Sequence, residues 1–234
     1  MSRPALVLGS LLPIRLASGS AAKSEVWARN VLCGSIFNSC HILSGVALNA
    51  KGPTVTLHVV SSLDGFIAKP DNTVAWLDGY ADDYEKGVSM DSAAGEEFVK
   101  SIGCFVLGSR TYEHALRLGW PYGDTPTVVV TSRELPSTRK SVEFYSGDLK
   151  RLVDEILAPR FRNAWLVGGA MLCQSFLALG LVDEIRLSIA PILLGHGLRL
   201  FGDSGTEKRW KLTDVVAYKN GFVELLYRSQ STDS

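Results

Sequence analysis

The chain has 234 residues, of which 46% are apolar and 21% are charged, and this fits one compact α/β domain with some chain left over. Lys and Arg together number 24, as do Asp and Glu, so the formal net charge is zero. There is no block of like charge that could follow a phosphate backbone, so we do not expect nucleic acid as a partner.

The cysteine and hydropathy patterns exclude two further classes of protein. Cys33, Cys40, Cys104 and Cys173 contain no CxxC pair, and Cys33, Cys40 and His41 have no fourth ligand near them, so neither a metal site nor a disulfide framework is expected. Arg15 interrupts the longest early apolar run before it reaches the roughly 18 residues that a membrane span requires. We therefore expect a reduced, soluble, cytoplasmic protein that does not bind membranes or metals.

The first 52 residues differ in composition from the rest of the chain. They are rich in Ser, Ala, Leu and Gly, and Glu25 is their only acidic residue. We expect residues 1–52 to be a poorly ordered extension or leader that precedes a domain over residues 53–230. Because basic residues and serines outnumber acids, one alternative is an organelle transit peptide, which would make the location organellar. A disordered tail or a start codon chosen too far upstream are the others.

The elements are predicted from periodicity and punctuation, beginning with a strand of β-branched residues over 54–60. An apolar stripe after an Asp148 cap indicates a helix over 148–158, and Asn220-Gly221 indicates a hairpin turn. Before residue 148 we also expect a helix at 95–102, a strand at 104–107, a helix at 111–118, and strands at 127–130 and 142–145. After residue 158 we expect a strand at 164–167, a helix ending at Gly180, a half-buried strand at 185–190, and the hairpin strands at 215–218 and 222–227. The class is α/β, with a mixed, mostly parallel sheet, helices on both faces and a C-terminal antiparallel hairpin.

Three of these strands run into turns whose residues suit phosphate binding. Gly108 opens a turn with hydroxyls and Arg110, Thr131 opens another before Arg133, and Val167 leads into Gly168-Gly169 and a helix. Ligands of open α/β sheets bind outside the carboxyl ends of the strands, where backbone amides at helix N-termini can receive a phosphate. Taken singly, a helix cap or a solvated turn explains each of them, but together they predict one groove for a phosphorylated dinucleotide.

Six ordered motifs resemble a known family. They lie at residues 61–68, 108–113, 128–133, 165–170, 180–186 and 191–195. In this order they are similar to the reductase domain of bacterial bifunctional riboflavin-biosynthesis deaminase-reductases and, more broadly, to dihydrofolate-reductase-like proteins. The resemblance covers about residues 54–228, and it implies the dihydrofolate-reductase-like fold, an NADPH cofactor and pairing into homodimers.

The resemblance also implies roles for individual residues on the cofactor side. Ile67 and Ala68 would lie against the nicotinamide, and Thr131, Ser132 and Arg133 would hold the adenosine 2′-phosphate. Gly168 and Gly169 resemble a pair that is joined by a cis peptide and opens a helix facing the pyrophosphate. The predicted cofactor site is completed by Gly108, Ser109, Arg110 and Thr111 after the earlier strand and by Val167, Ala170, Met171 and Leu172 around the glycine pair.

On the substrate side, Asp64 is the candidate catalytic and substrate-orienting residue, with an ordinary Asp-Gly turn as the alternative. Trp76 resembles a tryptophan that borders the substrate pocket, with core packing as the alternative. Three departures from the family pattern bear on which substrate and cofactor the protein uses. Ser109 replaces a basic residue, which leaves NADPH or NADH open; Ala81 replaces the acid that binds a pterin, which argues against folate reduction; and Val167 replaces a Glu of the riboflavin reductases.

The sequence thus predicts hydride transfer from a nicotinamide cofactor to a C=N or C=O group of a small heterocyclic or carbonyl substrate. Two alternatives stay open. One is reduction of the ribosylamino-pyrimidine of riboflavin biosynthesis, and the other is a nucleotide-binding module without turnover. The H-x-E and P-C-x-x-C signature of zinc deaminases is absent from the sequence, so deamination is not expected.

Overall fold

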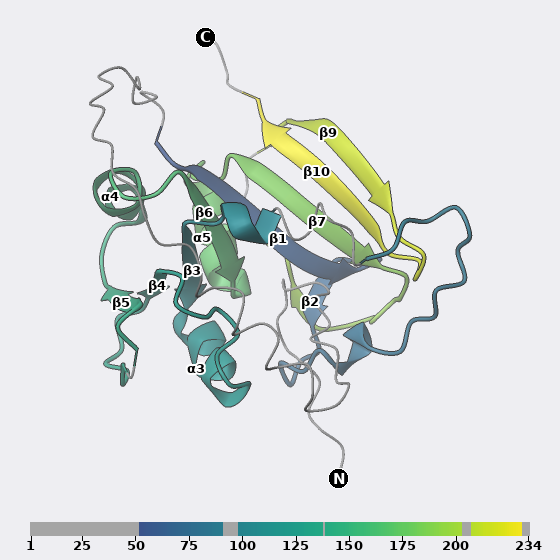
Figure 1. The fold of residues 1–234 in the computed structure, drawn as a ribbon, viewed down its shortest axis with the longest axis horizontal. Coiled ribbons are helices and arrows are strands. Elements are labelled where there is room, and N and C mark those ends of the chain that lie inside the picture. Colours follow the sequence, from purple (N-terminus) through teal and green to yellow (C-terminus); the bar gives the residue numbers. More distant parts are fainter. Residues whose placement is uncertain (1–51, 91–97, 138, 203–206, 231–234) are drawn as a thin grey trace, which may run out of the picture. The chain divides into compact units, whose positions relative to one another are not determined.

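The computed structural model describes residues 52–90, 98–137, 139–202 and 207–230. Its largest feature is an eight-stranded sheet in the order β5-β4-β3-β6-β1-β7-β10-β9, drawn in Figure 1. These strands are β1 (Thr54–Ser62), β3 (Cys104–Gly108), β4 (Thr127–Val130), β5 (Val142–Tyr145), β6 (Asn163–Gly168), β7 (Glu184–Ala190), β9 (Trp210–Ala217) and β10 (Val223–Ser229). The other elements are α3 (Ser109–Arg117), α4 (Leu149–Arg151), α5 (Ala170–Ala178), the short helices η1 (Ala75–Leu77) and η2 (Leu152–Leu157), and a two-stranded sheet of β2 (Phe66–Ala68) and β8 (Leu198–Arg199).

The sheet is mixed and mostly parallel, as predicted. Strands β5, β4, β3, β6, β1 and β7 run parallel to their neighbours. Only β10 runs antiparallel, to both β7 and β9, and it closes the C-terminal hairpin. At the hairpin turn the Phe222 amide N–H donates to Asn220 Oδ1 over 3.3 Å, and Gly221 takes a positive φ of 83°.

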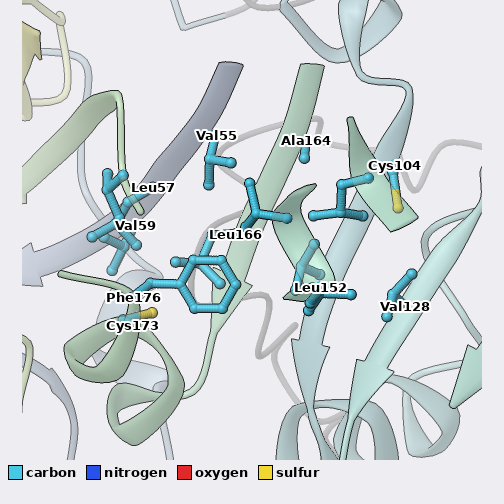
Figure 2. Packing of buried hydrophobic residues seen from close by; sticks show 14 of the residues in the cluster. Val55, Leu57, Val59, Cys104, Val128, Leu152, Ala164, Leu166, Cys173 and Phe176 are labelled. Carbon is cyan, nitrogen blue, oxygen red and sulfur yellow. The ribbon is translucent and has the colours of Figure 1, made fainter. Parts of the chain in front are cut away.

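Helices cover both faces of the sheet, because successive strand residues point to opposite sides. On one face, Leu152 of η2 and Phe176 of α5 pack against Leu57 and Leu166 of the central strands, as Figure 2 shows. On the other face, Tyr112 of α3 belongs to a separate buried cluster with Phe105 and Trp165. The core therefore consists of layers above and below β1, β3, β4 and β6, and this confirms the predicted fold class.

Several element boundaries differ from the sequence-based expectation. Helix α3 begins at Ser109 rather than 111, because Gly108 itself is the N-cap. The helix expected over 148–158 keeps its cap, in which Asp148 accepts from the Arg151 amide, but it changes to π-helical geometry over Leu152–Leu157. Strand β9 begins at Trp210 rather than 215. Its first residues are mostly polar and exposed, so the hydrophobic pattern did not indicate where the strand begins.

Burial on the second half of β7 is the reverse of what the alternation predicted, whereas Ile185 is buried as expected. Ser188 and Ala190, expected on the solvent side, are buried, whereas Leu187 and Ile189 are only half-buried. Arg186, on the polar side, lies over the ring of Phe98 at 4.5 Å, and residues 98–101 are helical. The predicted start of that helix at 95–97 lies outside the described residues, as do residues 1–51 with Cys33, Cys40 and His41.

Within the described ranges, no helix combines the length and apolar character needed to cross a bilayer. The same residues hold no group of three or more His, Cys, Asp or Glu side chains arranged to bind a metal ion. Cys104 and Cys173 are free thiols in the core, and burial raises the pKa of each to about 12. At neutral pH both therefore behave as small apolar core residues.

Candidate functional site

Three parallel strands end side by side at one edge of the sheet. Gly108, the last residue of β3, is level with Val130 of β4, and Leu107 is level with Gly168 of β6. The turns that follow these strands therefore begin at neighbouring positions. The predicted convergence of the corners at Gly108, Thr131 and Gly168 is confirmed.

The two glycine corners are in direct contact. A Cβ atom placed on Gly108 would lie 3.5 Å from the amide nitrogen of Gly169 and 3.6 Å from the carbonyl oxygen of Gly168. A Cβ on Gly169 would lie 3.6 Å from Thr111 Oγ1. The Gly168–Gly169 peptide is cis, as the family resemblance implies. Because none of these three residues carries a side chain, the backbones of the two turns can approach each other closely.

Each of these corners leads directly into a helix. Gly108 is the N-cap of α3 and Gly169 is the N-cap of α5. In the described residues no side chain caps the amides of either helix, and neither first turn contains an acidic residue. The amide N–H groups of a first helical turn have no partner within the helix and attract anions. Two such turns meet here, carrying Ser109, Arg110 and Thr111 on α3 and Ala170, Met171 and Leu172 on α5.

The third corner borders a pocket. After β4, Thr131 Oγ1 accepts a hydrogen bond from the Arg133 amide over 3.0 Å, which shapes the turn. A pocket of about 350 Å³ lies between this turn and the end of β5. It is lined by Thr131, Ser132, Arg133, Glu134, Leu135, Phe144, Tyr145 and Ser146. Its volume falls at the lower end of the range for small-molecule sites, and its lining combines an aromatic wall with hydroxyls and a guanidinium.

Arg133 is joined to helix α3 by an ion pair. Its Nη2 lies 2.6 Å from Glu113 Oε1 and its Nη1 lies 3.3 Å from Glu113 Oε2. The hydrogen bond from Arg133 lowers the pKa of the Glu113 carboxyl, so Glu113 is an anion at neutral pH. Sequence reasoning missed Glu113, although it lies in the 108–113 motif, because nothing local indicates a partner twenty residues away.

The sheet opens beside the glycine corners. Strand β1 is paired with β6 only as far as Leu57, opposite Leu166, but it stays paired with β7 as far as Ser62. Among the described residues, β1 therefore has a strand neighbour on one side only beyond Leu57. Ile67 and Ala68 follow on β2, where Ala68 is buried and Ile67 is half-buried. This opening is where the strand order reverses, which is the usual ligand position in open α/β sheets.

Asp64 holds two loops together. Its Oδ1 accepts from the Ser62 hydroxyl over 2.5 Å and from the Leu194 amide over 3.1 Å, and its Oδ2 accepts from the Gly195 amide over 2.7 Å. These bonds, the one from Ser62 above all, lower the pKa of Asp64 to about 2. The carboxylate is thus ionised and already hydrogen-bonded. Direct contact between Asp64 and a substrate stays a prediction, and its position fits a role in holding the loops.

Trp76 is a core residue. Its side chain is 6% exposed and packs in a cluster with Val60, Ala190 and Phe222. Its Nε1–H is buried without a hydrogen-bond partner in the described residues. The burial agrees with core packing, the alternative noted from sequence, and a place beside the substrate stays a prediction.

A charged cluster that the sequence did not predict lies on the same face as α3. His58 stacks on Trp165 at 4.9 Å, and Glu224 lies 3.5 Å from His58 Nε2 and 3.0 Å from Arg186 Nε. Burial lowers the pKa of His58, so the imidazole is neutral at pH 7. The pKa of Glu224 is also lowered, because its hydrogen bonds with His58 and the Ser188 hydroxyl and the charge of Arg186 outweigh its burial.

Comparison with known proteins identifies the family. The profile of the RibD C-terminal domain matches residues 53–224 of the chain. The chain belongs to the RibD C-terminal domain family. Among curated relatives, YwjB of Bacillus subtilis is 29% identical over 158 residues, which is 67% of this chain and 87% of that protein.

Two further similar proteins are longer than the segment that matches this chain. The riboflavin biosynthesis protein RibD of Corynebacterium ammoniagenes is 28% identical over 65% of this chain and 47% of its own length. A diaminohydroxyphosphoribosylaminopyrimidine deaminase/5-amino-6-(5-phosphoribosylamino)uracil reductase of Thermotoga maritima is 15% identical, with a TM-score of 0.56 over 76% of this chain and 57% of its own. The chain spans about half the length of both proteins. The second likeness shows that this chain shares a fold with part of that protein.

Proposed function

We propose that this RibD C-terminal domain is an NADPH-dependent reductase that transfers a hydride to a small pyrimidine-like or pterin-like heterocycle or to a carbonyl compound. One observation carries the proposal. Two uncapped helix N-termini meet at the glycine corners Gly108 and Gly169, and the guanidinium of Arg133 lies after the neighbouring strand. A dinucleotide with an additional phosphate requires this combination of an anion site and a separate cation.

The residues present fit such a cofactor. The amides around Gly108 and Gly169 would bind the pyrophosphate, with the Thr111 hydroxyl beside them. Thr131, Ser132 and Arg133 would bind the adenosine end in the 350 Å³ pocket. Ile67 and Ala68, at the opening between β1 and β6, would border the nicotinamide. The bound cofactor supplies a hydride from C4 of its nicotinamide, and the protein supplies position and electrostatics.

Asp64 would act on the substrate side by positioning. Because its pKa is about 2, Asp64 holds no proton to donate at neutral pH. The proton that completes reduction would then come from solvent. By bonding the amides of Leu194 and Gly195, Asp64 fixes the loop that faces the start of β2.

A spectrophotometric assay tests the proposed function. NADPH oxidation is followed with a panel of pyrimidines, pterins, quinones and small carbonyl compounds, each with and without the protein. Saturable oxidation with at least one acceptor is the expected result. Tight NADPH binding without reduction of any acceptor would instead favour a nucleotide-binding module without turnover.

The riboflavin step itself is the second candidate substrate. Two relatives are named for riboflavin biosynthesis or for 5-amino-6-(5-phosphoribosylamino)uracil reduction, and this favours it. Val167, in place of the Glu of the riboflavin reductases, argues against it. Complementation of a riboflavin auxotroph that lacks only this reductase distinguishes the specific reaction from the broader one.

We also propose that the chain forms a homodimer through the β9 edge of its sheet. In the described sheet β9 is the last strand, and its Leu212 and Val215 are 48% and 51% exposed. Leu212 is level with Tyr227 of β10, and Val215 is level with Leu225, and these β10 residues point to the same face of the sheet. The apolar surface therefore extends from β9 onto β10. An exposed strand edge beside apolar side chains favours pairing with another chain.

A further inference from the structure

The ion pair between Glu113 and Arg133, which lines the pocket, brings side chains with opposite cofactor preferences into contact. In nicotinamide-binding proteins, a carboxylate that accepts from the ribose 2′-hydroxyl favours NADH, whereas an arginine that receives the 2′-phosphate favours NADPH. Here the two side chains are in contact, with Nη2–Oε1 and Nη1–Oε2 distances of 2.6 and 3.3 Å. Their side chains are 54% and 34% exposed, so both can be reached from solvent.

The pair changes what the pocket offers to a phosphate. Glu113 neutralises the charge of Arg133 and takes one donor from each terminal nitrogen of the guanidinium. Glu134, a second acid, lines the pocket together with Arg133. A 2′-phosphate would have to approach a guanidinium whose charge is cancelled, against the repulsion of the Glu113 carboxylate.

We propose that Glu113 is a specificity-determining residue that limits the preference of this protein for NADPH over NADH by competing with the 2′-phosphate for Arg133. The inference rests on the proposed function, because it takes the pocket beside Arg133 as the adenosine end of the cofactor site. Glu113 needs no contact with the reacting atoms for this role. Its removal frees the guanidinium, and Arg133 then discriminates between the two cofactors more strongly.

The test uses two nucleotides that carry only the adenosine end. Adenosine 2′,5′-bisphosphate has the additional phosphate, and 5′-AMP lacks it. Calorimetric titration of the full chain gives the Kd of each for wild type, Glu113→Gln, Arg133→Gln and the double variant. The matched control is Glu155→Gln, because Glu155 forms a similarly bidentate exposed pair with Arg151, at 3.0 Å for both bonds, on the opposite helical layer.

The expected result for Glu113→Gln is binding of the bisphosphate that is tighter by roughly 1.5- to 5-fold, the range that exposed ion pairs contribute. Its affinity for 5′-AMP does not increase. In the Arg133→Gln background the same substitution has no effect, because the freed cation is missing. Glu155→Gln matches wild type, and salt reduces the effect of Glu113→Gln because both charges are exposed.

Three results would overturn the inference. They are weaker bisphosphate binding in Glu113→Gln, an equal change for both nucleotides, or a gain that persists without Arg133. If Glu113→Gln changes nucleotide binding as predicted but the wild-type chain oxidises no NADPH with any acceptor of the panel, only the proposed reductase function is contradicted. A wild-type chain that binds neither nucleotide contradicts both.

Discussion

Replacing Gly108 with alanine separates folding from cofactor binding. Gly108 has a φ of −85° and a ψ of 164°, which any residue can adopt. The added Cβ would make contacts of 3.5 and 3.6 Å, ordinary packing distances. A Gly→Ala change in a compatible conformation stabilises by about 0.4–1 kcal/mol, because it restricts the unfolded chain. We therefore expect the Tm to be unchanged or to rise by about 1–4 °C.

Cofactor binding should nevertheless weaken in Gly108→Ala. The new methyl group would lie 3.5 Å from the amide nitrogen of Gly169, on the approach that a pyrophosphate would take to that N–H. A hydrogen bond to a charged acceptor contributes about 1.5–3 kcal/mol, so its loss raises the Kd for NADPH roughly 10- to 150-fold. We therefore expect Gly108→Ala to fold stably but to bind NADPH weakly.

Calorimetric titration with NADPH and a thermal unfolding curve measure both effects on the same sample. Gly52→Ala is the matched control, because its Cβ would also have a nearest contact of 3.5 Å, to Ala158, at the opposite end of β1. The control should bind NADPH as wild type does. If Gly108→Ala binds NADPH with wild-type affinity, the glycine corners do not hold the pyrophosphate and the reasoning is refuted.

Three further predictions concern the loops, the charged cluster and the edge strand. Asp64→Asn should speed hydrogen exchange at the Leu194 and Gly195 amides, since a neutral amide accepts more weakly than a carboxylate; unchanged exchange would remove the loop-holding role. Because burial lowers the pKa of His58 below its unfolded value of 6.5, its contribution to stability is present above pH 6.5 and is lost as the pH falls below it. Urea midpoints should therefore drop between pH 7 and 5 more steeply in wild type than in His58→Gln, and parallel drops would exclude His58 as the cause. Leu212→Lys should convert a dimer to a monomer in light scattering, whereas a wild-type chain that is already monomeric contradicts the proposed interface.

The sequence predicted the elements whose hydrophobic pattern is strong. The apolar strands that end at Gly108 and Gly168, and the hairpin around Asn220-Gly221, are visible because local residue choice and tertiary position agree. Strand β8 was not predicted, because its two residues are exposed and owe their conformation to pairing with β2. Polar contacts between segments far apart in the chain could likewise not be predicted from the sequence.

The charged cluster illustrates the limit of pattern reasoning. Glu224 alternates with apolar residues on β10, which is typical of a solvent-facing position, yet it is 7% exposed. Its burial depends on Arg186 and His58 from two other strands, which no local signal links to it. The Glu113–Arg133 pair escaped prediction for the same reason. Strand ends could be predicted from the sequence, whereas the partners of individual charges required the fold.

A crystal structure of the protein with NADPH tests the central claim most directly. The account predicts density for the pyrophosphate between the first turns of α3 and α5, the adenosine in the pocket after Thr131, and the nicotinamide beside Ile67 and Ala68. A cofactor bound at another edge of the sheet, or phosphates that contact neither Gly108 nor Gly169, would contradict it.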